Sequence, residues 1–392
     1  MQTHLSLLPE DHEQALLIGR IHDPRDEGPS IVAIKGHTLH DLTPRFPTVS
    51  QLLEQNELTA IVAGTPATAR WSLDAVMRST LDNDRHAARF VAPCDLQVIK
   101  ACGVTFAGSM LERVIEEKAG GDPTRATQIR DEIVKVIGSA VSSLRPGSED
   151  AARVRQYLVK EGLWSQYLEV GIGPDAEVFT KAPVLSSVGS GEAIGILAAS
   201  KWNNPEPELV LAVNSHGQIR GATLGNDVNL RDIEGRSALL LGKAKDNNAS
   251  CAIGPFIRLF DERFTLDDAR HLELELNVSG DDGFTLAGHS STSQISRDLT
   301  DLAAQTCGRH HQYPDGFMLF TGTLFAPTED RDAPGQGFTH KLGDVVHIRS
   351  ARLGSLVNRV THSEDAPEWT QGITWLMANL AKRGLLGNLG PR

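Results

Sequence analysis

The sequence lacks a long apolar run, a surplus of basic residues and a regular cysteine pattern. Without an apolar run of membrane-spanning length, we expect no membrane partner. The formal net charge of -12 would repel a nucleic-acid backbone, so we expect no nucleic-acid partner either. The four cysteines form no CxxC pair, which favours reduced thiols over a disulfide framework or a zinc site.

The first twenty residues also lack the basic start and apolar core of a signal peptide and carry acidic side chains instead. Together with the reduced thiols, this predicts a cytoplasmic protein. The hydrophobic share of 40% and the charged share of 22% are typical of a soluble globular protein. A length of 392 residues is enough for two domains.

The pattern along the chain predicts a small domain followed by a large one. Residues 1–92 alternate short extended runs with turns and one helical stretch from Val49 to Glu54, which predicts a small N-terminal α/β domain. Residues 93–392 contain stronger strand signals, such as the alternation of apolar and polar residues from Leu272 to Val278. We therefore predict an α+β protein whose large domain is mostly antiparallel β.

One predicted β-hairpin in the large domain carries an unusual set of carboxylates. Residues 209–213 and residues 218–224 read as its two strands, with turn residues between them. Residues two apart on a strand point to the same face, so Glu206 and Glu208 aim at one point. Asp227 follows the return strand directly and is brought back towards that point.

Three carboxylates this close repel one another and raise each other's pKa unless a cation lies among them. A set of oxygen ligands alone suits Mg²⁺ or Mn²⁺. The hairpin by itself leaves a second interpretation open, because two glutamates at the start of a strand are often a solvated strand end.

Several pieces of the sequence occur in a recognisable order: PEPEL, GNDVNLRD, GKAKDNNASCAIGP, TGT and KLGDVV…LGSLVN. Together they resemble the catalytic domain of the fumarylacetoacetate hydrolase superfamily, over roughly the C-terminal two thirds of the chain. The resemblance implies a mixed β-sandwich roll for residues 93–392. It also implies one Mg²⁺ bound by a Glu-x-Glu pair and a later Asp, which here are Glu206, Glu208 and Asp227.

Within this superfamily, WNNPEPE, GNDVNLRDIEGRSALL and HQYPDGF are similar to the 2-keto-3-deoxy-pentonate dehydratases of D-xylose and L-arabinose degradation. The hydrolase branch has a histidine that activates water after the first strand of this domain, and Ser109 stands at that position here. A serine without a neighbouring base cannot take a proton from water near neutral pH. This difference favours dehydration over hydrolysis of a C–C bond.

The resemblance implies catalytic roles for three residues. Lys243 in LGKAK matches the lysine of the family and would take a proton or steady an enolate, whereas Lys245 is interpreted as a solvated surface charge. Glu177 stands at the position of the acid/base glutamate of the dehydratases, and apolar neighbours would raise its pKa. Thr323 in TGT would orient the leaving group.

Four further residues are candidates for the same site. Thr105 and Ser109 would bind hydroxyl groups of the substrate. Arg231 would either meet a substrate oxygen or pair with Asp232. Glu234 replaces a glutamine of the hydrolase branch, and the sequence assigns it no role.

The sequence thus predicts a Mg²⁺-dependent lyase, with Mn²⁺ as the alternative ion. It would convert a 2-keto-3-deoxy-pentonate to 2,5-dioxopentanoate by loss of a C3 proton and the C4 hydroxyl, and the configuration at C4 stays open. The alternatives are a hydrolase that cleaves a C–C bond of a 2,4-diketo acid and a metal-binding protein with a dead site. The retained proton-transfer groups disfavour the dead site. The family resemblance also implies a homodimer or a homotetramer.

Overall fold

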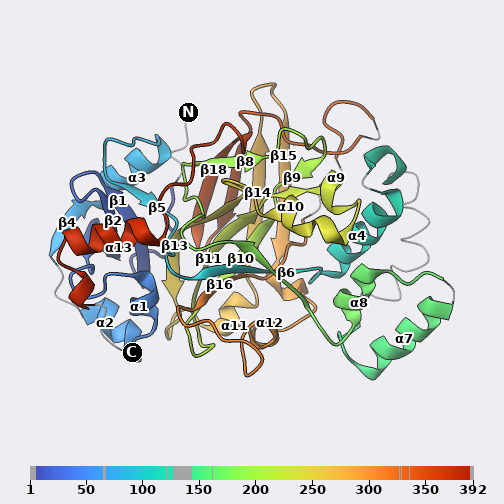
Figure 1. The fold of residues 1–392 in the computed structure, drawn as a ribbon, viewed down its shortest axis with the longest axis horizontal. Helices are drawn as coiled ribbons and strands as arrows, with labels where there is room; N and C mark the ends of the chain where they lie inside the picture. The colour runs from blue at the N-terminus through green and yellow to red at the C-terminus, as the bar shows by residue number, and fades with distance from the viewer. Residues whose placement is uncertain are drawn as a thin grey trace.

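The computed structural model describes residues 6–64, 68–120, 122–126, 144–160, 162–325, 327, 329–334 and 336–388. Within this part of the chain, two large sheets form the centre, and helices lie around them (Figure 1). The larger sheet has, in spatial order, the strands β4 (Ala69–Ser72), β3 (Thr38–Asp41), β2 (Gly28–Lys35), β1 (Leu17–Asp23), β13 (Cys251–Leu259), β11 (Ile219–Asp227), β10 (Pro207–Val213), β16 (Phe317–Phe320), β6 (Val98–Gly103) and β7 (Glu177–Ala182), with β5 (Arg89–Val91) paired to β1.

The smaller sheets and the helices complete the described architecture. The five-stranded sheet has the order β15 (Thr285–Ser291), β14 (Glu273–Ser279), β17 (Val345–Ser350), β18 (Gly354–His362) and β8 (Ala193–Ile196), and β12 (Asn229–Leu230) pairs with β9 (Asn203–Asn204). The helices are α1 (Val49–Leu53), α2 (Leu58–Gly64), α3 (Leu73–Leu81), α4 (Ala107–Ala119), α7 (Glu149–Lys160), α8 (Gln166–Ile172), α9 (Arg231–Glu234), α10 (Leu241–Lys245), α11 (Leu266–Ala269), α12 (Leu299–Thr306) and α13 (Ile373–Lys382), with short 3₁₀ turns η2 (Ala238–Leu240), η3 (Thr292–Gln294) and η4 (Leu386–Asn388).

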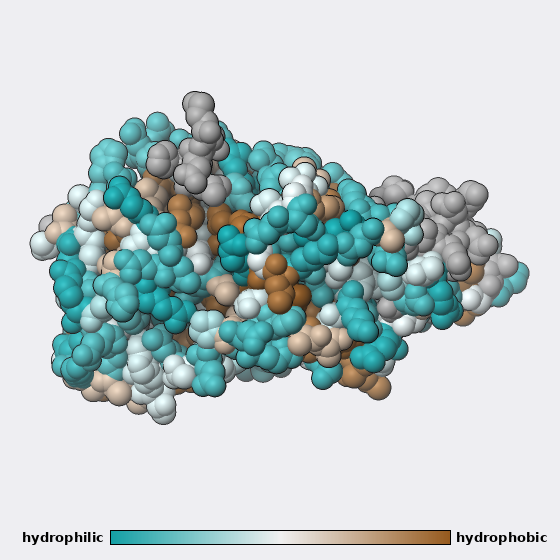
Figure 2. Space-filling view, turned by 90° about the horizontal axis from the view of Figure 1, so that it is seen from above, coloured by the Kyte–Doolittle hydropathy of each residue, from teal (hydrophilic) through white to brown (hydrophobic). Residues whose placement is uncertain are grey.

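Most neighbouring strands are antiparallel, and the parallel pairs β16–β6 and β18–β8 make both large sheets mixed. The predicted α+β class with a mostly antiparallel mixed sheet is confirmed. No helix among the described residues is long and apolar enough to cross a membrane. The face shown in Figure 2 is mainly hydrophilic, with hydrophobic side chains gathered near its middle.

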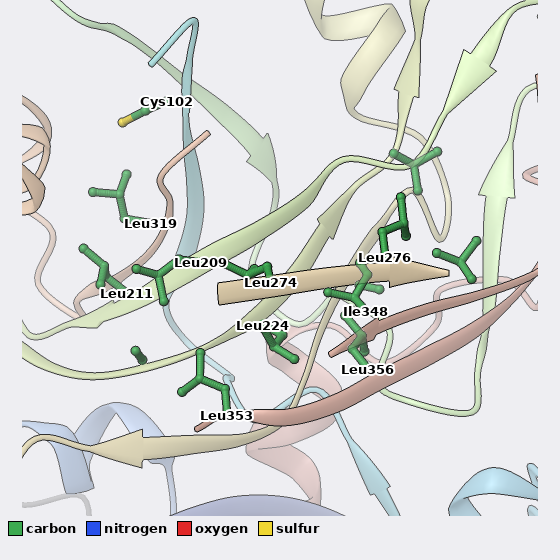
Figure 3. Packing of buried hydrophobic residues seen from close by; sticks show 14 of the residues in the cluster. Cys102, Leu209, Leu211, Leu224, Leu274, Leu276, Leu319, Ile348, Leu353 and Leu356 are labelled. Atoms are coloured by element: carbon green, nitrogen blue, oxygen red, sulfur yellow. The ribbon is translucent and has the colours of Figure 1, made fainter. Parts of the chain in front are cut away.

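The space between the two large sheets is filled by the main hydrophobic cluster (Figure 3). Leu209 of β10 and Leu224 of β11 contribute from the larger sheet, and Leu274 of β14 and Leu356 of β18 contribute from the smaller one. Fully burying a leucine side chain contributes about 1.5–3 kcal/mol. This layer therefore fixes the position of the β10–β11 hairpin, which carries the predicted metal ligands.

The alternation of apolar and polar residues from Leu272 to Val278 predicted a strand, and strand β14 lies there. On β14, the exposed residues Glu273, Glu275 and Asn277 alternate with buried apolar residues. A strand with one face on the core requires this period of two. The prediction of this strand is confirmed.

The N-terminal strands extend the larger sheet. Leu17 and Ile18 of β1 pair with Arg258 and Ile257 of β13, so residues from both predicted domains share one sheet. Helix α13 packs on the same side of the molecule, on the left in Figure 1. The boundary after residue 92 stays a prediction.

Candidate active site

Three carboxylates converge at the open end of the β10–β11 hairpin. The amide of Asp227, at the end of β11, donates to the carbonyl oxygen of Glu206 at 3.0 Å. Glu208 lies two residues further on and therefore shares the face of Glu206. One oxygen from each carboxylate lies within 4.8 Å of the others, and all three side chains are buried. The predicted convergence is confirmed.

The electrostatics of this cluster fit a divalent cation. Burial, reinforced by repulsion from Asp227 and Glu206, raises the pKa of Glu208 well above its usual range. Burial also raises the pKa of Glu206. A cation among the three groups relieves this repulsion, and three carboxylates are a donor set that suits Mg²⁺ or Mn²⁺. The three side chains could therefore hold one such ion.

Two buried lysines partly neutralise the cluster. Lys245 Nζ lies 2.5 Å from Glu206 Oε2 and 3.0 Å from Asp227 Oδ2, and Lys181 Nζ lies 2.8 Å from Asp227 Oδ1. Burial raises the pKa of Asp227, but the two ammonium groups outweigh it and lower that pKa. Burial lowers the pKa of Lys245, but the carboxylates dominate and raise it. Lys245 is therefore a fixed cation in this arrangement.

Lys243 is exposed, so the lysine that was predicted to be catalytic does not lie among the carboxylates. Both lysines lie in α10, and residues two apart on a helix point to opposite sides because each residue turns by about 100°. The side of α10 that faces the carboxylates carries Lys245, which is 3% exposed. The prediction that Lys245 is a solvated surface charge is wrong for the same reason.

Glu177, the first residue of β7, shares a cavity of about 20 Å³ with the three carboxylates. Burial, together with the negative charge of Glu234, raises the pKa of Glu177 to about 7. A carboxyl group with this pKa exchanges protons readily near neutral pH. Thr323 also lines the cavity, and its hydroxyl donates to the Pro207 carbonyl oxygen at 3.0 Å.

Arg113 is a residue of this site that the sequence analysis missed. Its guanidinium hydrogen-bonds Glu206 and lies 2.7 Å from Glu116 and 3.3 Å from Glu234. The sequence around it, LERVIEEK, is typical of a solvated helix face with pairs spaced at i and i+3. The pairing also places Glu234, which had no assigned role, against the wall of the cavity.

Arg231 pairs with α4 and not with Asp232, so one of its two expected roles is wrong, and its contact with a substrate oxygen stays a prediction. Its guanidinium lies 2.6 Å from Glu116 Oε1 and 4.2 Å from the ring centre of Trp202. Asp232 instead accepts a hydrogen bond from the Ser200 hydroxyl at 2.7 Å. Arg231 therefore fixes α9 to α4, and it is absent from the lining of the described cavity.

Thr105 supports the loop that holds a metal ligand. Its hydroxyl donates to the Thr321 carbonyl oxygen at 2.7 Å, and a Cβ on Gly322 would lie 2.0 Å from that hydroxyl. Gly322 in turn donates its amide to Glu208 Oε2 at 2.6 Å. The predicted contact of Thr105 with substrate stays a prediction, and the side chain of Ser109 lies outside the described part of the chain.

A signal for Lys181 was present in the sequence. Alternation along β7 places Glu177, Phe179 and Lys181 on one face. The assignment of Glu177 to the site would therefore have indicated Lys181, four residues later on the same strand.

Residues 173–361 match the family described as Fumarylacetoacetate (FAA) hydrolase C-terminal. The chain is 33% identical over 195 residues to the probable 2-keto-3-deoxyxylonate dehydratase of Haloferax volcanii, a match that covers 50% of this chain and 63% of that protein. It is 32% identical over 184 residues to the 2-dehydro-3-deoxy-D-arabinonate dehydratase of Saccharolobus solfataricus, with coverages of 47% and 58%. The chain thus spans less than two thirds of the length of each of these curated relatives.

A solved structure extends the similarity to the fold. The 2-keto-3-deoxy-D-arabinonate dehydratase complexed with magnesium and 2,5-dioxopentanoate aligns with a TM-score of 0.61 at 22% identity, over 88% of this chain and 99% of that chain. At this identity the likeness concerns the fold, and it extends beyond residues 173–361.

Proposed function

We propose that the protein is a magnesium-dependent hydro-lyase that acts on a 2-keto-3-deoxy-pentonate, and the match of residues 173–361 to the fumarylacetoacetate hydrolase C-terminal family supports this proposal. The reaction removes the C4 hydroxyl as water and yields 2,5-dioxopentanoate. Two curated relatives that carry dehydratase names support this reaction. A protein of the same fold that holds magnesium and 2,5-dioxopentanoate supports the ion and the product.

The observation that carries the proposal is the content of one small cavity. Three carboxylates that suit a divalent cation share it with Glu177, whose pKa is raised to about 7, and with the ammonium group of Lys245. A purely structural metal site has no need of a proton-exchanging carboxyl group beside its ligands. The combination therefore favours an enzyme over a metal-binding protein with a dead site.

The names of the two relatives also favour one configuration of the substrate. In a 2-keto-3-deoxy-pentonate, C2 is a ketone and C3 is a methylene group, so C4 is the single stereocentre. D-Xylose and D-arabinose share their configuration at C4, and the two names therefore describe one compound. We propose that the D form is preferred over the form derived from L-arabinose.

The side chains of the cavity can carry the proton transfers. Magnesium, when bound, supplies Lewis acidity towards the keto and carboxylate oxygens of the substrate. Glu177 as a carboxylate takes a proton from C3, and as an acid it returns that proton to the departing C4 hydroxyl. Lys245 keeps its proton and places a positive charge beside the developing enolate. A proton shift from C5 to C3 then gives an enol with a C4–C5 double bond, and transfer of the proton of the enol hydroxyl to C4 gives the aldehyde.

The position of the Arg113 side chain limits the volume of the cavity that is open to substrate. A volume of about 20 Å³ holds an ion or a water molecule but not a five-carbon acid. Arg113 narrows the cavity by pairing with Glu206. Substrate binding therefore displaces Arg113 from Glu206, and its planar guanidinium is suited to bind the substrate carboxylate instead.

The proposal is tested with the purified protein and both C4 forms of 2-keto-3-deoxy-pentonate, each with Mg²⁺ and with EDTA, followed by proton NMR. We expect a Mg²⁺-dependent aldehyde signal of 2,5-dioxopentanoate, with faster turnover of the D form. If neither substrate is converted in the presence of Mg²⁺, the proposal of a dehydratase is rejected. A 2,4-diketo acid that gives two acid products would support the hydrolase instead.

We also propose that the protein forms a homodimer or a homotetramer, as the family resemblance implies. Size-exclusion chromatography with light scattering measures the mass directly. A mass of one chain at assay concentrations contradicts this assembly.

A further inference from the structure

A second, larger cavity is lined in part by residues of β1 and β5. It has a volume of about 180 Å³ and is lined by Arg20, His22, Arg85 and Arg89, with Glu192, Trp369 and neighbouring residues completing its wall. We call it the arginine cavity. Among the described residues, it shares no lining residue with the cavity of the carboxylates.

The register of the strands brings three basic side chains of this cavity together. Arg20 and His22 are two residues apart on β1 and therefore share a face. His22 pairs directly with Arg89 of the antiparallel strand β5. The guanidinium groups of Arg20 and Arg89 thus lie on either side of the His22 imidazole, and the closeness of these two like charges has a cost for the fold that an anion would offset.

Little of this positive charge is neutralised within the chain. Arg20 donates to the carbonyl oxygen of Ala92 at 3.1 Å and to that of Cys94, and no carboxylate of the described residues lies within ion-pair distance of it. Within the described part of the chain, the one ion pair of Arg89 is a distant contact, at 3.8 Å, with Glu192. Glu192 in turn accepts from the Gly189 amide at 2.7 Å.

Two buried guanidinium donors have no protein partner. The Nε atoms of Arg20 and Arg89 are both buried without a hydrogen-bond acceptor among the described residues. The side chains that carry them belong to residues that are 6% and 9% exposed. A buried donor that lacks a partner costs free energy, and both arginines that carry these donors line the cavity.

The pKa of His22 is also affected by the positive charges of this cavity. Burial lowers the pKa of His22, and the charges of Arg89 and Arg20 lower it further. Burial and the positive charge around it therefore both favour the neutral imidazole, and this positive charge is the condition expected of an anion site before its ligand binds.

We propose that the arginine cavity binds a small oxyanion, a molecule that presents a carboxylate or a phosphate group to Arg20 and Arg89. Guanidinium groups bind both kinds of group through paired hydrogen bonds. Trp369, which is 46% exposed, offers an apolar wall to the rest of the ligand. Glu192 and Glu368 also line the cavity, and their charges limit the ligand to one or two negative charges.

The test is a titration of the full-length protein with inorganic phosphate and, separately, with succinate at matched ionic strength. Calorimetry measures binding, and fluorescence reports whether Trp369 senses it. We expect saturable binding of at least one anion at about 1 mM or below, with a fluorescence change that Trp369→Phe abolishes. The anion that binds more tightly shows whether the ligand carries phosphate or carboxylate.

Three arginine variants locate the site. Arg89→Gln should weaken binding at least tenfold, and Arg85→Gln, at an exposed position whose change leaves the core intact, should weaken it several-fold. Arg78→Gln, an exposed arginine on α3 outside the cavity, is the matched control and should leave binding unchanged. Absence of binding to both anions overturns the proposal, as does binding that neither Arg89→Gln nor Arg85→Gln weakens.

Discussion

The two cavities of this protein are electrostatic opposites. In the carboxylate cavity, burial and crowded negative charge raise the pKa of Glu208 and of Glu177. In the arginine cavity, burial and crowded positive charge lower the pKa of His22. Each cavity thus disfavours the charge it already concentrates, and each is suited to a ligand of the opposite sign.

The cavities also differ in how far the chain neutralises them. Lys181, Lys245 and Arg113 pair with the carboxylates and leave a space of only about 20 Å³. The arginine cavity has weak internal pairing and a space of about 180 Å³. A choice by volume alone would therefore take the arginine cavity as the active site. The residue types that line the two cavities instead identify the cavity of the carboxylates as the reaction site and the arginine cavity as a binding site.

The largest expected effect comes from Glu208→Gln, which keeps the shape of the ligand and removes its charge. We expect the affinity for Mg²⁺ and the dehydration rate each to fall by about a hundredfold or more. Calorimetric titration with Mg²⁺ and the NMR assay measure these losses. Glu262→Gln, at an exposed glutamate, is the control and should change neither.

The same variant should stabilise the protein in EDTA. The pKa of Glu208 is raised in the folded state, so its contribution to stability is present below the unfolded pKa and is lost as the pH rises through the folded pKa. At neutral pH and above, replacing the carboxyl group removes this cost, and the melting temperature in EDTA should rise. A lower melting temperature in EDTA would show that Glu208 serves the fold instead of the ion.

The next effect separates the two lysines of α10. Lys245→Met should lower activity by about a hundredfold or more, and because it leaves buried carboxylates without a partner, it should destabilise the metal-free protein by about 3–5 kcal/mol. Lys243→Met, at an exposed position, should leave activity and stability within about 0.5 kcal/mol of the wild type. Activity assays and urea unfolding test both. An inactive Lys243→Met beside an active Lys245→Met would restore the assignment made from sequence.

These lysines show what the sequence could and could not predict. The convergence of Glu206, Glu208 and Asp227 was predictable because a strand has a period of two and the turn between the strands is short. The choice between Lys243 and Lys245 depends on the rotation of a five-residue helix, α10, which no local pattern fixes. The family motif predicted a lysine in this stretch, but the packing of α10 determines which of the two lysines reaches the carboxylates.

The same limit applies to the arginines. Arg113 lies in a stretch whose local sequence is typical of a solvated helix face, and both Arg113 and Arg231 are held by contacts between residues far apart in the sequence. The arginine cavity depends on the register of β1 with β5, two strands far apart in the sequence. Long-range register is the part of a fold that short-range patterns leave open.

A smaller effect concerns the pH dependence set by Glu177. If its carboxylate takes the C3 proton, kcat/KM should rise with pH through a limb near 7, because the ionised form is the reactive one. Glu234→Gln removes a negative charge that raises this pKa, so the limb should move to lower pH. Rates at saturating Mg²⁺ across a pH series measure the shift, with Glu262→Gln as the control. A limb that stays in place or falls with pH contradicts this role.

The smallest effect is expected on the pKa of His22. It tests whether the positive charge of the arginine cavity lowers this pKa, as the negative charge of the other cavity raises that of Glu177. Arg89 lies directly across from His22 and lowers its pKa, so Arg89→Gln should raise the pKa of His22, whereas Arg78→Gln should not. An anion held by the same arginines should also raise it, because negative charge favours the imidazolium. NMR titration of the imidazole protons, assigned with His22→Gln, follows both changes. If the anion leaves the pKa of His22 unchanged while it binds the protein, it binds elsewhere, and the symmetry between the two cavities is lost.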